Sequence, residues 1–85
     1  MIKESSWVVR GSQRKKILEA LENPKIPTQL KEETKLSLNN VSDVLKVLSE
    51  KGLVKCINPL EKTGRFYELT TKGSKVREEL VGQLK

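Results

Sequence analysis

The sequence lacks the residues on which most catalytic and metal-binding sites depend. Its 85 residues include no histidine and one cysteine, Cys56. A Ser-His or Cys-His pair therefore cannot form, a zinc site would be short of ligands, and no intrachain disulfide is possible. The five glycines stand singly, so there is no glycine-rich phosphate loop. These absences predict a protein that is not an enzyme and that holds no metal and no cofactor.

Aromatic residues and long apolar runs are also scarce. The chain has one tryptophan, one tyrosine and one phenylalanine, and 35% of its residues are hydrophobic. No apolar run approaches the length of a membrane span, and the opening Met-Ile-Lys-Glu-Ser-Ser lacks the apolar core of a signal peptide. We therefore expect a cytoplasmic protein with no membrane partner, built as a single domain over residues 1–85.

Acidic residues are the minority charge. Lysine and arginine number 17 against 11 aspartate and glutamate, which gives a formal net charge of +6. An excess of this size favours a polyanionic partner, although a solvated lysine-rich surface is the alternative. Residues 10–16 carry four basic residues and no acidic one, and residues 51–65 carry four against Glu61 alone. Two basic segments therefore flank the middle of the chain.

The first predicted helix covers residues 12–22. Its apolar residues recur at helical spacing, and they are Ile17, Leu18 and Leu21. Ser12 is the expected N-cap. The helix should end before Pro24, because proline disfavours helix in the residue that precedes it.

Two further helices are predicted before the middle of the chain. A short one over residues 27–34 begins at Pro27, which suits a first helical turn. A longer one over residues 38–51 follows Ser37, its expected N-cap, and ends at Gly52, which is free to adopt a left-handed conformation. Its predicted core-facing stripe consists of Leu38, Val41, Leu45 and Leu48.

From residue 54 the apolar period changes from helical spacing to two. This change predicts a β-hairpin over residues 54–69 with a long tip, followed by a last helix over residues 71–84. Four side chains should face the same side of the hairpin, namely Val54, Cys56, Tyr67 and Leu69. Cys56 is accordingly expected to be a small buried hydrophobe.

The order of these motifs resembles a known family over roughly residues 10–80. The stretches RGSQRKKILEAL, IPTQLKEETKLSLNNVSDVLKVLSEKGLVKC and GRFYELTTKG are similar to winged helix-turn-helix regulators of the MarR and ArsR type, particularly small archaeal ones. The resemblance implies an α+β, mostly α fold with a three-helix core, a β-hairpin wing and a C-terminal helix. It also implies a transcriptional regulator that binds double-stranded DNA, with the third helix in the major groove and the wing at phosphate or the minor groove.

Candidate DNA-contacting residues follow from helical geometry and charge. If the apolar stripe faces the core, the open side of the third helix carries the candidate base readers Asn39, Asn40, Asp43 and Lys46. The candidate backbone contacts are the cap of that helix and residues of the basic segments, namely Arg14, Lys15, Lys16, Ser37, Lys62 and Arg65. The alternative is that the asparagines merely favour a helix start and that the charges form a solvated face. The nearly neutral third helix also leaves open a winged-helix module that binds protein in a transcription or replication complex.

Three residues depart from the pattern that the resemblance implies. Asp43 stands where these regulators often carry a basic or neutral residue, and Lys31 where a small residue commonly lets the third helix approach. Lys35 stands where the turn between the helices usually has glycine. A left-handed backbone at Lys35 would cost on the order of 1 kcal/mol.

The last predicted helix suggests a subunit contact. A small domain can cover only part of its apolar stripe, to which the single tryptophan could be added. The dimer candidates are Trp7, Val76, Leu80, Val81 and Leu84. We expect a two-fold symmetric homodimer, and no signature of a pocket for a small effector is visible in the sequence.

Overall fold

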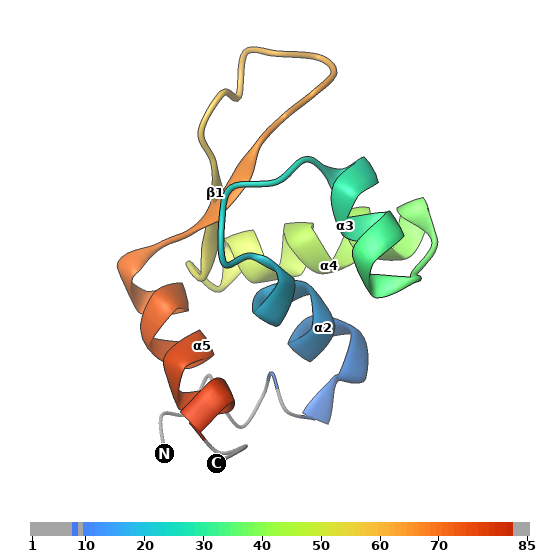
Figure 1. The fold of residues 1–85 in the computed structure, drawn as a ribbon. Coiled ribbons are helices and arrows are strands. Elements are labelled where there is room, and N and C mark those ends of the chain that lie inside the picture. Colours follow the sequence, from blue (N-terminus) through green and yellow to red (C-terminus); the bar gives the residue numbers. More distant parts are fainter. Residues whose placement is uncertain (1–7, 9, 83–85) are drawn as a thin grey trace.

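The predicted mostly helical α+β fold is confirmed in a computed structural model, which describes Val8 and residues 10–82. Figure 1 shows a group of helices from which a hairpin projects. The elements, in chain order, are α2 (Ser12–Ala20), α3 (Pro27–Thr34), α4 (Leu38–Glu50), β1 (Val54–Cys56), β2 (Tyr67–Leu69) and α5 (Thr71–Gly82). No helix among the described residues is both long enough and apolar enough to cross a membrane.

The first helix differs from its prediction at both ends. Ser12 is not the N-cap: it is the first residue of α2, Gly11 occupies the cap position, and no side chain caps the helix. At the other end α2 stops at Ala20, where the N–H of Leu21 turns to the carbonyl of Leu18 at 3.2 Å. This tight final turn places Pro24 outside the helix, where its missing N–H has no cost.

The turn between α3 and α4 contains a left-handed residue, Lys35, at the position where the resemblance implies glycine. Pro27 is the first residue of α3, as predicted, and Lys35 after its end has φ +64° and ψ +20°. The hydroxyl of Thr34 donates to the carbonyl of Leu30 at 2.6 Å. Ser37 then caps α4 by accepting from the N–H of Asn40 at 3.2 Å, which confirms the predicted cap.

The end of α4 is a Schellman motif. Gly52 has φ +75°, its N–H donates to the carbonyl of Ser49 at 3.0 Å, and the N–H of Leu53 donates to the carbonyl of Leu48 at 2.9 Å. Both bonds satisfy carbonyls that a helix end leaves without partners. The predicted glycine stop is therefore confirmed.

The hairpin has the predicted shared face and one additional partner. Val54 pairs with Leu69 and Cys56 with Tyr67 in an antiparallel ladder, so these four side chains share a face. Cys56 lies on the predicted face but is half-buried, whereas a buried side chain was expected. Lys25, in the connection between α2 and α3, forms an isolated bridge to Tyr67. Strand β2 therefore lies between β1 on one side and the backbone of Lys25 on the other.

The core unites α2, α3, α4, the base of the hairpin and α5. Its buried side chains are Val8, Ile17, Leu18, Leu21, Leu30, Val41, Val44, Leu45, Leu48, Leu53, Val54, Val76 and Leu80. Leu38 is not among them, so its predicted core position is wrong: it is 45% exposed. At about 100° per residue, Leu38 lies at the edge of the buried stripe of α4, and Val44 completes the stripe instead.

The dimer candidates on α5 also need correction. Val76 and Leu80 are 0% and 1% exposed and belong to the core, so they leave no uncovered apolar stripe. Val81 is half-buried, whereas Trp7 and Leu84 lie outside the described residues. The stripe is covered because α5 packs on α2, where Arg77 Nε donates to the carbonyl of Glu19 at 3.0 Å.

Candidate nucleic-acid interface

The exposed face of α4 carries three of the four predicted base readers. Asn39, Asp43 and Lys46 are exposed and recur at spacings of four and three, so they form one stripe opposite the buried one. Asn40 is half-buried because it lies about 100° around the helix from Asn39. We call Asn39, Asp43 and Lys46 the polar stripe of α4. One turn beyond Lys46, on the same side of the helix, lies the exposed carboxylate of Glu50.

The first of two hollows beside this helix lies between α4, α3 and the wing. The wing is the hairpin together with its tip, residues 54–69. The wing hollow has a volume of about 240 Å³. Its lining residues are Ile26, Pro27, Thr28, Leu38, Ser42, Lys62, Thr63, Gly64, Arg65 and Tyr67. The structure thus brings the predicted wing cations, Lys62 and Arg65, to the side of α4.

The second hollow lies on the other side of α4, against the start of α2. It has a volume of about 440 Å³ and is lined by Arg10, Gly11, Ser12, Gln13, Arg14, Asp43, Val44 and Val47. We call it the α2 hollow. Arg14, a predicted backbone contact, therefore shares a hollow with Asp43 of the polar stripe, and each side of α4 has two basic side chains beside it.

The wing cations are exposed and free of carboxylate partners. In the described part of the chain neither Lys62 nor Arg65 forms an ion pair. The Nε of Arg65 donates to the backbone carbonyl of Glu61, which leaves the outer nitrogens of the guanidinium pointing away from that bond. Both side chains can therefore donate to an anionic ligand.

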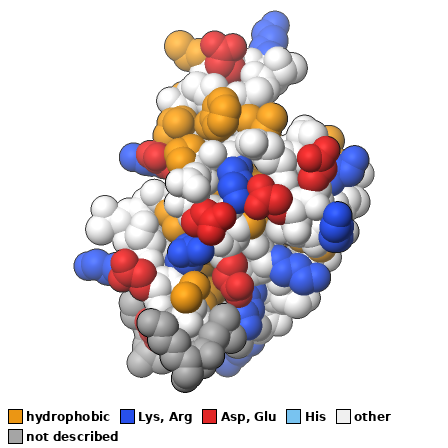
Figure 2. All heavy atoms as spheres, viewed as in Figure 1, with side chains coloured by type: hydrophobic (Ala, Val, Ile, Leu, Met, Phe, Trp, Pro, Cys, Tyr) orange, Lys and Arg blue, Asp and Glu red, His pale blue; other side chains and the backbone are white. Residues whose placement is uncertain are grey.

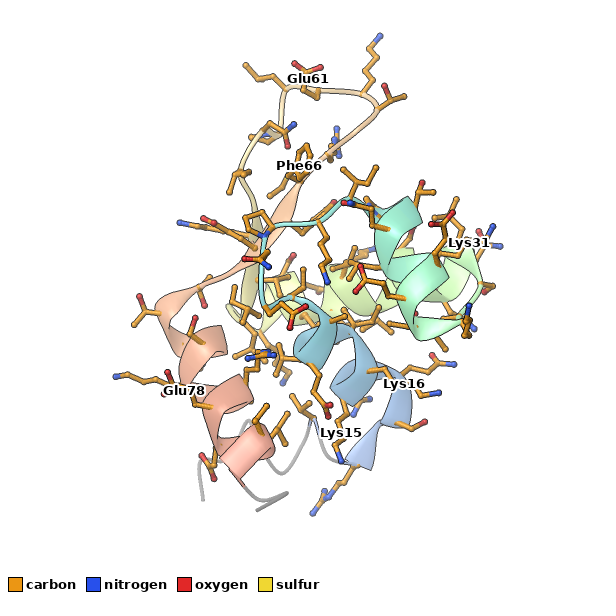
Figure 3. The ribbon with its side chains drawn as sticks, in the orientation of Figure 1. Lys15, Lys16, Lys31, Glu61, Phe66 and Glu78 are labelled. Carbon is orange, nitrogen blue, oxygen red and sulfur yellow. The ribbon has the colours of Figure 1, made fainter. Side chains whose placement is uncertain are left out.

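The other predicted contacts to the DNA backbone are not all gathered at the wing. Lys15 and Lys16 lie far from the wing tip, which Glu61 marks in Figure 3. Lys15 lies 4.0 Å from Glu19 across one helical turn, a weak ion pair between half-buried side chains. Ser37 uses its hydroxyl oxygen as the cap of α4 and retains its own proton for donation.

Several polar residues that line the hollows were not among the predicted site residues. Thr28 and Ser42 belong to the wing hollow, and Arg10 and Gln13 to the α2 hollow. Thr28 could have been found as the residue after the helix-starting proline, because a helix start exposes N–H donors. Ser42 lies one turn after Leu38, whose wrongly predicted burial concealed that side of α4.

A family model described as "Winged helix-turn-helix" matches residues 14–83, and the chain belongs to this family. Among solved structures it is similar to the crystal structure of the reduced form of MarR from E. coli, at 29% identity and a TM-score of 0.76, covering 95% of this chain and 64% of that one.

Two similar structures contain DNA. One is a mutant MarR from E. coli complexed with operator DNA, at 29% identity and a TM-score of 0.75, covering 93% of this chain and 61% of that one. The other is ZitR from Lactococcus lactis in complex with DNA, at 27% identity and a TM-score of 0.75, covering 84% of this chain and 50% of that one. The chain thus spans between half and two thirds of the length of these structures. No curated protein sequence matches it significantly.

Proposed function

We propose that this chain is a transcriptional regulator that binds double-stranded DNA with α4 in the major groove and the wing on the backbone. The observation that carries the proposal is the position of the polar stripe of α4 between two hollows. Arg10 and Arg14 line one hollow, and Lys62 and Arg65 line the other. A reading helix between two groups of cations suits a duplex, because phosphates lie on both sides of its major groove.

The polar stripe has the chemistry to distinguish bases. The amide of Asn39 can pair with N6 and N7 of adenine, Asp43 can accept from N4 of cytosine, and Lys46 can donate to O6 and N7 of guanine. All three side chains are exposed, so they reach a ligand without unfolding the helix. The likeness to MarR and ZitR structures that contain DNA supports DNA binding by this chain.

A binding experiment tests the proposal directly. The full chain is titrated against a labelled duplex of random sequence at low salt, and the bound duplexes are then selected and sequenced. We expect saturable binding, weakening with salt, and enrichment of a preferred site. Absence of binding to any duplex at low salt would overturn the proposal.

A protein-binding module is the second candidate, because two observations favour it. Asp43 and Glu50 outweigh Lys46 on the exposed side of α4, which opposes phosphate. The outer face of the wing exposes the cross-strand neighbours Ile57 and Phe66. A chain that binds no DNA while its α4 variants lose a protein partner would establish this alternative.

Homodimerisation is also part of the proposal. A two-fold dimer would present two α4 helices to successive major grooves on one side of a duplex. Of the candidates on the described part of α5, Val81 retains exposed surface, so it is the residue to test. Light scattering should give twice the mass of one chain, and Val81→Asp should lower that mass; a single-chain mass for the unaltered protein would contradict the dimer.

A further inference from the structure

The tip of the wing exposes a large apolar side chain. Leu60 is 97% exposed, whereas the other exposed hydrophobic residues of the wing, Ile57 and Phe66, are 48% and 40% exposed. In Figure 2 the end of the wing carries hydrophobic, acidic and basic side chains side by side, away from the body of the molecule. Leu60 contributes almost nothing to the core, so its apolar surface is fully available to a ligand.

The loop that carries Leu60 is held together by its own hydrogen bonds. The side-chain oxygen of Asn58 accepts from the N–H of Phe66 at 2.8 Å, and its side-chain nitrogen donates to the carbonyl of Gly64 at 3.1 Å. The N–H of Glu61 donates to the carbonyl of Asn58 at 3.1 Å. One amide therefore joins the two arms of the loop, and Leu60 is displayed on a braced tip.

The surroundings of Leu60 favour a polyanion over an apolar ligand. Lys62 and Arg65 follow it in the same loop and exceed the single negative charge of Glu61. The same two cations line the wing hollow beside Leu38 and Ser42, at the start of α4. If α4 lies in the major groove, the tip of the wing therefore reaches the adjoining backbone and minor groove.

We infer that Leu60 is an apolar wedge, which enters the minor groove between two base pairs and bends the duplex while Lys62 and Arg65 hold the flanking phosphates. The inference rests on the proposed function. Leucine is one of the residues that minor-groove proteins insert between base steps. A wedge must resist being pushed back, and the Asn58 brace supplies that resistance.

The test compares Leu60→Ala with Leu60→Met on the selected duplex. Bending is measured by energy transfer between dyes at the two ends, and unstacking by fluorescence of 2-aminopurine placed at each adenine beside the α4 site. We expect the unaltered protein to bend the duplex by at least about 20° and to brighten 2-aminopurine at one step. Leu60→Ala should abolish both signals and weaken binding about tenfold without changing its salt dependence, since no charge is lost. Leu60→Met should retain both signals.

The control is Ile57→Ala, which removes an apolar side chain from the same wing away from its tip and should leave the bend unchanged.

Failure of the inference differs from failure of the proposed function. If the unaltered protein binds no duplex, both fail. If it binds a straight, fully stacked duplex, or if Leu60→Ala bends DNA as the unaltered protein does, the wedge is overturned and DNA binding stands. Thermal unfolding should be the same for all variants at Leu60, because that side chain contacts solvent.

Discussion

The backbones of Lys25 and Tyr67 pair in both directions. The N–H of Lys25 donates to the carbonyl of Tyr67 at 3.0 Å, and the N–H of Tyr67 donates to the carbonyl of Lys25 at 2.9 Å. The ammonium of Lys25 is nearly buried and lies 2.6 Å from Glu33 and 3.5 Å from Glu22. One residue between α2 and α3 therefore joins the base of the wing to α3, through Glu33, and to the segment that follows α2, through Glu22.

Replacing Lys25 should weaken the fold. Lys25→Ala removes the cation that Glu22 and Glu33 share, although Glu22 retains Arg77 at 3.5 Å. It also removes an apolar stem, while the backbone pair with Tyr67 remains. Because both carboxylates are about half exposed, we expect a loss of about 1 to 2 kcal/mol in the free energy of unfolding, rather than the larger cost of breaking a fully buried pair. Urea denaturation measures it. Lys15→Ala, which removes the longer 4.0 Å pair with Glu19, is the matched control and should change stability by less than about 0.5 kcal/mol.

Two glycines should resist substitution for different reasons. A Cβ at Gly73 would lie 1.9 Å from the carbonyl oxygen of Leu53, so Gly73→Ala must push α5 away from the end of α4. We expect a loss of about 3 kcal/mol in unfolding free energy. A Cβ at Gly52 would meet nothing within 4 Å, but the residue has φ +75°. Gly52→Ala should therefore cost about 1 to 2 kcal/mol through backbone strain alone.

Asparagine separates these two mechanisms. Gly52→Asn should recover part of the loss, since asparagine tolerates the left-handed region better than alanine does. Gly73→Asn should be at least as damaging as Gly73→Ala, because the obstruction by Leu53 grows with the side chain. Equal losses for alanine and asparagine at Gly52 would contradict the strain explanation.

Lys35→Gly should stabilise the protein. Lys35 is exposed and has φ +64°, so its side chain adds strain without core contacts. Relief of about 1 to 2 kcal/mol is partly offset by the extra freedom that glycine gives the unfolded chain, about 0.5 to 1 kcal/mol. The expected net gain is about 0.5 kcal/mol, measured by urea denaturation. Lys35→Ala retains the strain and should show no such gain; a gain as large as that of glycine would point to charge instead.

DNA binding should separate phosphate contacts from base contacts. Lys62→Ala should weaken binding to all duplexes alike and lower the slope of log affinity against log salt by about 0.9. Asn39→Ala should lose about 1 to 3 kcal/mol on the preferred site and little on random DNA. Lys75→Ala, an exposed cation of α5 outside both hollows, is the control for charge alone. If Asn39→Ala binds the preferred site as the unaltered protein does, the polar stripe is not the reading element.

Local signals were sufficient where a structure depends on neighbouring residues. The helix start at Pro27, the cap at Ser37 and the stop at Gly52 were all predictable, because capping and left-handed turns involve residues a few positions apart. The shared face of the hairpin followed in the same way from its alternating apolar residues. All three residues of the polar stripe of α4 were predicted to lie on its open side, because one helical period determines both faces of a helix. The fourth predicted reader, Asn40, lies outside that stripe and is half-buried.

Predictions failed where a distant element decides burial. The extent to which Leu38 or Val44 is covered depends on what packs beside α4, and the coverage of Val76 and Leu80 depends on how α5 meets α2. Helical spacing identifies an apolar face without identifying its partner.

The sequence by itself determined the order and type of the elements and the polar residues of α4, since each follows from short-range spacing and backbone preference. The winged helix-turn-helix architecture was implied by the resemblance of these motifs to a known family. Only the tertiary structure decided the bridge between Lys25 and Tyr67, the two hollows beside α4 and the braced display of Leu60. The bridge and the hollows join residues far apart in the chain, and their positions depend on how the helices and the wing pack together, which no local pattern encodes. The brace joins the two arms of one loop through the side chain of Asn58, whose hydrogen-bond partners the sequence pattern does not specify.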